Sequence, residues 1–204
     1  MSDLLHALEE RFGAHRVVAI PTAPNELPLI AIDIESRSQV TVITTNGLAD
    51  YKMPIPEKLA GREYNELCFC LPSYWEWENV DNPSMNWIFP WIQKMAQYVV
   101  EKNTWFGPGH TIPNGKEALP LSPTMQQNYF LISDPILLEQ ELAPITVGEK
   151  NIHFLTIIPI FEDEMDMKAE KGSAKFFKKF MEKGGTEILD DYRRSTLKSK
   201  WRMF

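Results

Sequence analysis

A histidine in a glycine-rich loop and a dense run of carboxylates are the residues best suited to chemistry. His110 lies within GPGHTIPNG at 107–115, and loops are where catalytic and binding residues concentrate. Four carboxylates fall within 162–166, and carboxylate oxygens are suitable ligands for a divalent cation. One hypothesis is therefore a hydrolase centred on His110 and this acidic run.

The common sequence signatures of catalysis are nevertheless absent. There is no GxSxG nucleophile elbow, no P-loop and no GxGxxG dinucleotide fingerprint. The run at 162–166 lacks the glycine-centred twelve-residue loop of calcium sites. It is typical of a solvated first helical turn, which the helix dipole stabilises. The ring of His110 could equally hold its own loop through a hydrogen bond. We therefore expect no catalytic residues, no metal site and no cofactor.

An aromatic and acidic segment at 74–81 is a stronger candidate for a functional surface. It alternates tryptophan and glutamate soon after a predicted strand. Aromatic anchors surrounded by charge are typical of the centres of protein interfaces. The alternative is that both tryptophans fold back onto the core as a lid. The predicted partner-binding residues are Trp75, Glu76, Trp77, Glu78 and Asp81.

The net charge of −7 is divided unevenly along the chain. Residues 165–204 hold 11 basic and 6 acidic side chains, or +5, which leaves 10 basic and 22 acidic, or −12, in residues 1–164. An acidic body repels nucleic acid and attracts cationic partners. The basic part lacks a nucleic-acid-binding motif. We therefore expect a protein partner and no nucleic acid.

Length and composition favour one globular domain over residues 1–204. With 44% apolar residues, a chain of this size can build a core without disulfides. Cys68 and Cys70 are two apart on a predicted strand, which suits two buried thiols better than a disulfide. No apolar run approaches the roughly 18 residues of a membrane span, and no signal peptide is recognisable. The expected location is the cytoplasm, without membrane contact.

Hydrophobic periodicity predicts an α/β (α+β) domain with a mixed, largely antiparallel sheet flanked by helices. A turn at 36–38 should join the first two strands as a hairpin. The last helix should bury Phe176, Phe177, Phe180 and Met181, with Ser173 as its cap, inside a basic helical segment at about 165–204. The predicted helices span 3–12, 86–101 and 173–183, and the predicted strands 30–34, 40–45, 64–71, 127–133 and 152–158.

Several short segments, read in order, resemble the bacterial branch of the Suppressor of fused domain family. They comprise a turn after a strand, an Arg-x-x-x-Glu-Leu strand that ends in Leu-Pro, a tryptophan-bearing helix, a Gly-His-Thr loop and a Pro-x-x-x-x-Glu segment. Ala49 departs from the serine usual in the turn. The residues that carry the resemblance are Thr45, Gly47, Leu48, Arg62, Glu66, Pro72, Trp87, Gly109, His110, Pro159 and Glu164.

The resemblance implies a fold like the amino-terminal domain of Suppressor of fused, and a protein that binds other proteins instead of catalysing a reaction. For bacterial members it further implies an immunity protein that neutralises a cognate toxin by binding it. The acidic body would suit a basic toxin. An alternative is a regulator that binds an endogenous partner by adding a strand at a sheet edge.

Overall fold

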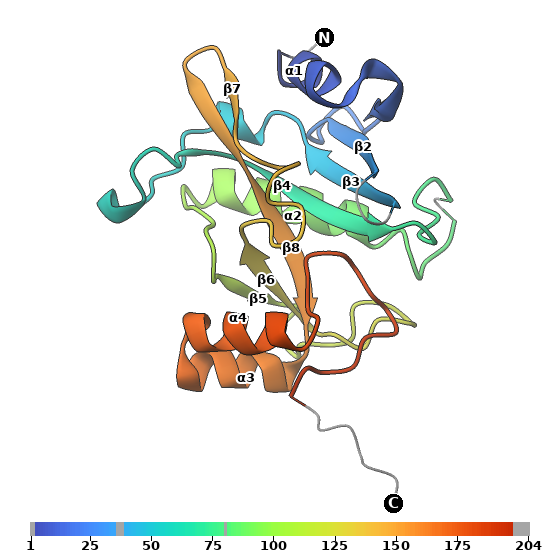
Figure 1. Cartoon of the computed structure of the whole chain (residues 1–204), viewed down its shortest axis with the longest axis vertical. Helices are drawn as coiled ribbons and strands as arrows, with labels where there is room; N and C mark the ends of the chain where they lie inside the picture. Colours follow the sequence, from blue (N-terminus) through green and yellow to red (C-terminus); the bar gives the residue numbers. More distant parts are fainter. Residues whose placement is uncertain (1–2, 36–38, 80, 198–204) are drawn as a thin grey trace, which may run out of the picture.

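The computed structural model describes residues 3–35, 39–79 and 81–197 (Figure 1). Eight strands form one sheet in the order β1-β2-β3-β4-β8-β6-β5, and β7 pairs with β8 beside this path. The strands are β1 (Val17–Ile20), β2 (Leu29–Glu35), β3 (Gln39–Thr45), β4 (Tyr64–Pro72), β5 (Thr111–Pro113), β6 (Tyr129–Ser133), β7 (Ile145–Val147) and β8 (Lys150–Ile160). The helices are α1 (Asp3–Phe12), α2 (Ile88–Glu101), α3 (Glu162–Lys171) and α4 (Ser173–Glu182), with short 3-10 turns at Ala14–Arg16, Leu48–Asp50 and Glu57–Leu59.

Strand β8 organises the sheet because it pairs along both of its sides. Its middle residues pair in parallel with β4, from Tyr64↔Ile152 to Cys68↔Thr156. Its end pairs antiparallel with β6, and its start with β7. The other neighbouring strands are all antiparallel. The expected mixed, largely antiparallel sheet is confirmed.

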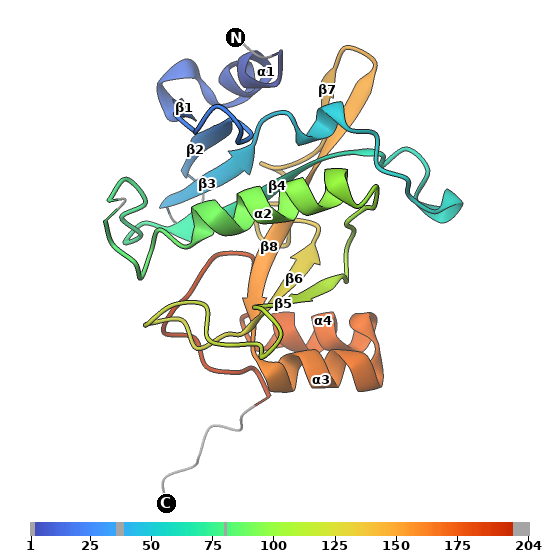
Figure 2. The same cartoon turned by 180° about the vertical axis from the view of Figure 1, so that it is seen from behind.

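Helix α2 lies across one face of the sheet, and α1 and the α3–α4 pair lie towards opposite ends of the molecule (Figures 1 and 2). Alternate residues of β4 serve two cores. Leu67, Phe69 and Leu71 pack in the cluster beneath α2, and Cys68 and Cys70 in the cluster on the other face. This alternation confirms a strand covered on both faces, and both cysteines are buried free thiols. A third cluster joins α4 to β6 and β8.

The predicted helices and longer strands are present, with three differences in detail. Strands β1, β5 and β7 were not predicted, and β5 lies inside the loop expected at 107–115. Met181 is exposed and not inward-facing, because α4 buries only Phe176 and Phe180. Gly172 occupies the N-cap of α4 in place of Ser173. The turn expected at 36–38 lies outside the described residues. No helix among the described residues is long and apolar enough to cross a membrane.

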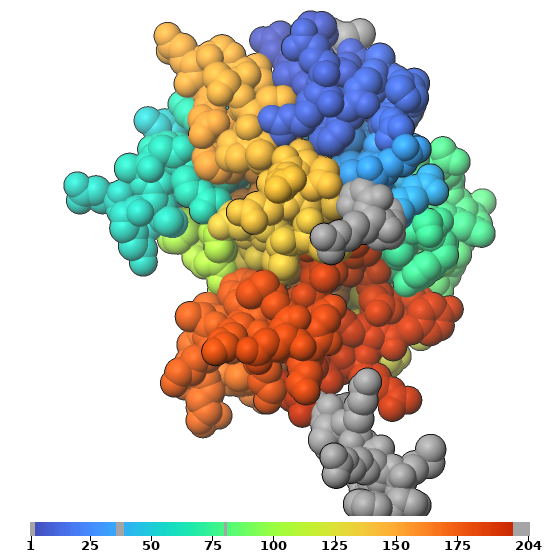
Figure 3. Space-filling model, viewed as in Figure 1, coloured from blue at the N-terminus to red at the C-terminus, as the bar shows by residue number. Residues whose placement is uncertain are grey.

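The segment at 185–197, here called the C-terminal strap, is not helical and completes the sheet. Beyond Cys68, strand β4 no longer pairs with β8. Cys70 instead forms a parallel bridge with Ile188, and the amide of Leu189 donates to the carbonyl of Cys70 at 2.8 Å. Helix therefore ends at Glu182 in the part of the basic segment that the structure describes. Figure 3 shows the strap beside α3 and α4 on one face of the molecule.

Buried carboxylates attach the strap to the body. Glu187 accepts hydrogen bonds from the amides of Ile136, Leu137 and Leu138, at 2.7–3.0 Å. Glu164, which was expected in a solvated turn, is fully buried and receives Arg193 on both oxygens, at 2.6 and 2.8 Å. Burial alone would raise the pKa of Glu164. The hydrogen bonds and positive charge of Arg193, together with hydrogen bonds from backbone amides, outweigh burial, so the pKa of Glu164 is lowered.

We expect Arg193→Ala to reduce the free energy of unfolding by roughly 3–5 kcal/mol, because Glu164 would stay buried without its cation. Urea titration of the whole chain measures this. Arg194→Ala is the matched control: Arg194 is the exposed neighbour, and its removal should cost less than about 0.5 kcal/mol. Equal losses for the two variants would show that the buried ion pair does not anchor the strap.

Candidate functional site

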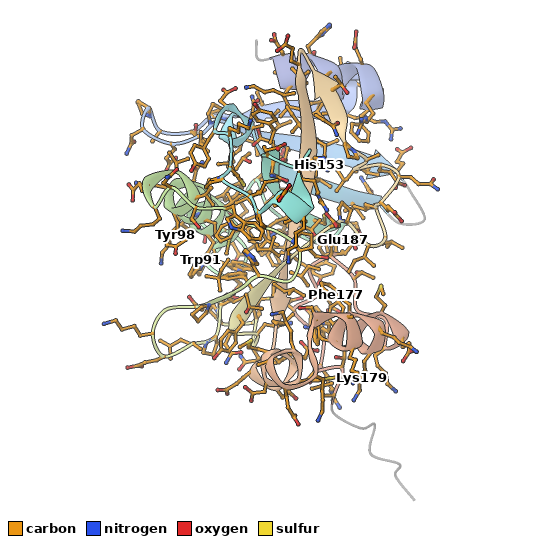
Figure 4. All side chains as sticks on the ribbon, turned by 90° about the vertical axis from the view of Figure 1, so that its left-hand side faces the viewer. Trp91, Tyr98, His153, Phe177, Lys179 and Glu187 are labelled. Atoms are coloured by element: carbon orange, nitrogen blue, oxygen red, sulfur yellow. The ribbon has the colours of Figure 1, made fainter. Side chains whose placement is uncertain are left out.

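A groove of about 570 Å³ lies between α2 and the edge strand β5. The helix contributes Trp91, Lys94, Met95 and Tyr98. These positions follow the i, i+3, i+4, i+7 spacing that places side chains on one helical face. The opposite wall comes from Phe106, Gly109, His110, Thr111, Ile112 and Pro113. Figure 4 shows Trp91 and Tyr98 on the side of the molecule that α2 covers.

The aromatic walls of the groove are held in place by packing against neighbouring rings. The ring of Trp91 lies 4.7 Å from that of Phe130 in the core, measured between centroids. Tyr98 stacks on Phe106 at 6.1 Å with an angle of 14° between the rings. Tyr98 nevertheless keeps 49% of its surface exposed. The groove is therefore preformed, and it presents aromatic surface to solvent.

The backbone of β5 forms one end of the described sheet. The carbonyl of His110 accepts from Ile132, and the amide of Asn114 donates to Asn128, so the even-numbered residues bond towards β6. The peptide groups of Thr111 and Pro113 consequently point away from the sheet. Pro113 has no N–H. The open edge thus offers the amide and carbonyl of Thr111 to another extended chain, whereas the carbonyl of Pro113 already accepts the amide of Gly115 at 3.0 Å.

His110 lies in the groove wall, where ring contacts hold it. Its ring is 4.3 Å from that of Trp105 and meets Phe106 edge-on. No hydrogen bond from the imidazole is present within the described part of the chain, so the loop-pinning bond considered above does not form. Burial, and secondarily the charge of Lys168, lower the pKa of His110 and keep the ring neutral near pH 7.

This arrangement suits binding better than hydrolysis. The groove lining contains one hydroxyl on its β5 wall, that of Thr111, and no carboxylate that could orient the imidazole of His110. Two of the four carboxylates at 162–166 serve structure, since Glu164 binds Arg193 and Asp163 accepts from Ser195 at 2.7 Å. The other two, Glu162 and Asp166, are exposed, as expected for a solvated helical turn. Within residues 3–35, 39–79 and 81–197, no three His, Cys, Asp or Glu side chains are grouped to hold a metal ion.

A second cluster brings together four of the residues that carried the family resemblance. Glu66 is buried and accepts the amides of Gly47, Leu48 and Ala49 at 2.9–3.2 Å, and also the hydroxyl of Thr45. Gly47 has a φ of +130°, which favours glycine. Ala49 joins this cluster through its amide, so the serine hydroxyl is not required for it. The cluster is a buried clamp on the turn after β3.

Burial raises the pKa of Glu66 and the four hydrogen bonds lower it. Burial is the larger effect, and the pKa is raised to about 7. A carboxyl near neutrality inside a turn would be a functional candidate if it faced a cavity. Glu66 does not line the groove, and all its described partners belong to its own turn and the adjoining strand. We therefore assign it to structure.

Most of the remaining family-motif residues also support the framework. Arg62 forms a bidentate ion pair with Asp134, Trp87 is in the core, and the carbonyl of Pro159 accepts from Arg193 at 3.0 Å. Pro72 ends β4. Gly109 has a φ of +92°, and a Cβ there would lie 3.0 Å from the hydroxyl of Ser173. Of the motif residues, Gly109 and His110 reach the groove.

The predicted partner-binding residues at 75–81 divide between the core and the surface. Trp75 is 4% exposed, packs against Trp87 and donates from Nε1 to the carbonyl of Met85 at 3.1 Å. It is therefore a core residue, as the lid alternative anticipated, and direct partner contact by Trp75 is withdrawn. Trp77 is half-buried. Glu76, Glu78 and Asp81 are exposed, and for these four residues partner binding remains a prediction.

The strap adds aromatic and acidic groups beside this segment. Tyr192 is 82% exposed and meets Tyr74 edge-on at 6.1 Å, and the hydroxyl of Tyr74 donates to Asp191 at 2.8 Å. We call Tyr74, Tyr192, Asp190 and Asp191, with Glu76, Glu78 and Asp81, the acidic–aromatic face. Its strap residues lie more than 100 positions from Tyr74 in the sequence, so local patterns could not reveal them.

Comparison with known proteins agrees with this fold. A model of the Suppressor of fused protein (SUFU) family matches residues 24–194, and the chain belongs to this family. The family is known for binding other proteins. A comparison with curated protein sequences gives no match.

Solved structures show the same fold at low identity. The crystal structure of the Sufu–Fu complex matches with a TM-score of 0.65 and 17% identity, covering 95% of this chain and 90% of that one. The SUFU homologue from Neisseria gonorrhoeae FA 1090 matches with a TM-score of 0.62 and 18% identity, covering 97% of both chains. Drosophila Suppressor of Fused matches with a TM-score of 0.56 and 18% identity. The match covers 88% of this chain and 42% of the Drosophila chain.

We expect the stabilising contribution of Glu66 to decrease as pH rises. The pKa is raised on folding, from 4.5 to about 7, so folding takes up a proton between these values. The advantage of the wild type over Glu66→Gln is largest below pH 4.5 and should shrink by on the order of 3 kcal/mol by pH 8.

Urea unfolding at half-unit pH steps measures this difference, with the exposed carboxyl of Glu57 replaced in a Glu57→Gln control. The control should keep a constant difference from wild type. A pH-independent difference for Glu66→Gln would contradict a raised pKa.

Proposed function

We propose that this protein binds an extended segment of a partner protein in the groove between α2 and β5. The observation that carries the proposal is a preformed aromatic groove of about 570 Å³ directly beside an open strand edge. Its volume is within the roughly 300–1,000 Å³ typical of ligand pockets. An edge strand supplies backbone hydrogen bonds, and an adjacent pocket takes alternate side chains, which is how strand addition achieves affinity and specificity.

The chemistry of β5 limits how such a segment would bind. Thr111 can exchange both a donated and an accepted hydrogen bond, whereas Pro113 has no N–H and its carbonyl already accepts the amide of Gly115. Proline at an edge also prevents long, unspecific pairing between sheets. Backbone pairing would therefore be short, and most of the binding free energy would come from a side chain placed between Trp91 and Tyr98. Support also comes from a structural relative, Sufu, which is solved in a complex with Fu.

Tyr98→Ala should weaken the partner complex by about tenfold or more, because exposed aromatic anchors at interface centres commonly contribute at least 1–2 kcal/mol. The partner is recovered with the tagged chain from its native host, and its Kd is measured by isothermal titration calorimetry. Val100→Ala is the matched control, since Val100 is 46% exposed on the same helix but does not line the groove. Equal affinities for the two variants would show that the partner does not use the groove.

A second candidate function is the neutralisation of a cognate toxin. It is supported by the acidic–aromatic face, which combines exposed tyrosines with acidic side chains and complements a basic protein. A net charge of −7 would add long-range attraction to such a toxin. This role uses a different surface from the groove, so the two functions can be separated by mutation.

Co-expression with a toxin encoded beside the gene tests this second function. Wild type should restore growth, and the triple variant Glu76→Lys, Glu78→Lys, Asp81→Lys should lose protection by reversing the charge of the face. Tyr98→Ala should still protect. Absence of protection by the wild type, or full protection by the folded triple variant, would exclude toxin neutralisation through this face.

A further inference from the structure

We infer that the groove selects a partner segment in which a large apolar side chain lies next to an aspartate or glutamate. This inference rests on the proposed binding of an extended segment and adds the chemical class of that segment. The preference would be opposite to the one that the overall charge suggests, because a protein of net charge −7 generally attracts cations.

The first observation is the charge of the lining. The ten residues that form the groove include Lys94 and no aspartate or glutamate, although 28 of the 204 residues of the chain are acidic. Lys94 is exposed beside these apolar walls, so its ammonium is accessible to an anion on an incoming segment. A basic segment would find no countercharge in this lining, and an uncharged segment would leave Lys94 unpaired.

The second observation is the position of the Lys94 ammonium. Nζ lies 4.4 Å above the centre of the Trp91 ring, and this contact holds the charge against one aromatic wall. Lys94 precedes Tyr98 by one helical turn, so the ammonium and the ring of Tyr98 lie on the same face of α2. No ion pair or hydrogen bond of Lys94 occurs within the described portions of the chain. A carboxylate placed beside an aromatic or large aliphatic anchor would therefore meet an unneutralised cation.

The third observation is a further cation behind the opposite wall. The hydroxyl of Ser173, at the start of α4, lies close to Gly109, so the α3–α4 pair contacts the loop that carries His110. Lys168 of α3 is near enough to His110 to help lower its pKa. The neutral His110 ring keeps an N–H that can donate to a carboxylate. Both walls thus favour an anion, one through an ammonium and the other through an imidazole donor supported by Lys168.

A displayed library of random peptides tests the inference even while the partner is unidentified. Peptides are selected on the intact chain, and those that also bind Tyr98→Ala are removed, which leaves groove-dependent sequences. We expect these to carry an aromatic or large aliphatic residue with aspartate or glutamate within two positions. Selection on Lys94→Gln should keep the apolar residue and lose the acidic preference.

The strongest selected peptide is then synthesised with blocked termini, together with a version in which its acidic residue is changed to the amide. Fluorescence anisotropy should show about tenfold weaker binding of the amide version, as expected for the loss of a charge-assisted hydrogen bond. Lys94→Gln should reduce this ratio to near one. Lys102→Gln, an exposed lysine at the end of the same helix outside the groove, should preserve it.

The outcomes separate this inference from the proposed function. Groove-dependent peptides that are neutral or basic, or a ratio unchanged by Lys94→Gln, overturn the acidic preference and leave binding in the groove intact. Peptides that all bind Tyr98→Ala as well as wild type overturn both.

Discussion

The structure depends on the requirement that buried backbone amides find hydrogen-bond acceptors where the chain leaves regular secondary structure. Three buried glutamates supply them. Glu66 serves the turn after β3, Glu187 the segment after β6, and Glu164 the start of α3 and the end of the strap. A carboxylate has two oxygens and several lone pairs, so one side chain can satisfy a whole turn of N–H groups. Each glutamate also joins parts of the chain that are distant in sequence, and together they fix the loops around the sheet.

The buried carboxylates of Glu164 and Glu66 have pKa values shifted in opposite directions. Glu164 has a guanidinium partner, and its lowered pKa makes its contribution to stability greatest above pH 4.5 and lost on acidification. Glu66 has only neutral donors, so burial prevails and raises its pKa. The contribution of Glu66 to stability is therefore greatest at low pH and is lost as the pH rises. The cation of Arg193 is therefore what distinguishes the surroundings of Glu164 from those of Glu66. The groove presents the complementary case, since Lys94 lies over the ring of Trp91 but has no carboxylate partner among the described residues.

The sequence allowed prediction of elements whose evidence is local. The hairpin of β2 and β3 follows from alternating isoleucines, and α2 from apolar spacing over four turns. Strands β1, β5 and β7 have three or four residues each, too few for a periodic signal. The pairing of β4 with β8 joins residues almost 90 positions apart, which no local pattern specifies.

The candidate site was only partly predictable for the same reason. The family resemblance included Gly109 and His110, but the apolar periodicity of α2 alone did not distinguish the face that lines the groove from the face that packs in the core. The spacing of Trp91, Lys94, Met95 and Tyr98 was a usable signal, because a lysine among three large apolar residues on one face is unusual for a core. Glu187 and Arg193 carried no signal, since their partners lie 29–51 residues away.

The pairing of the strap with the end of β4, beyond the residues that pair with β8, also bears on how the chain folds during synthesis. Residues 185–197 leave the ribosome after every strand of the sheet, yet Ile188 bridges to Cys70 and Arg193 neutralises Glu164. Until they emerge, three amides and a buried carboxylate lack their partners, and the fork between the two strands stays open. The nascent chain would thus expose unpaired strand edges until late in translation, a period in which chaperones are most useful. Folding would then be completed in one late, cooperative step, governed by residues 185–197.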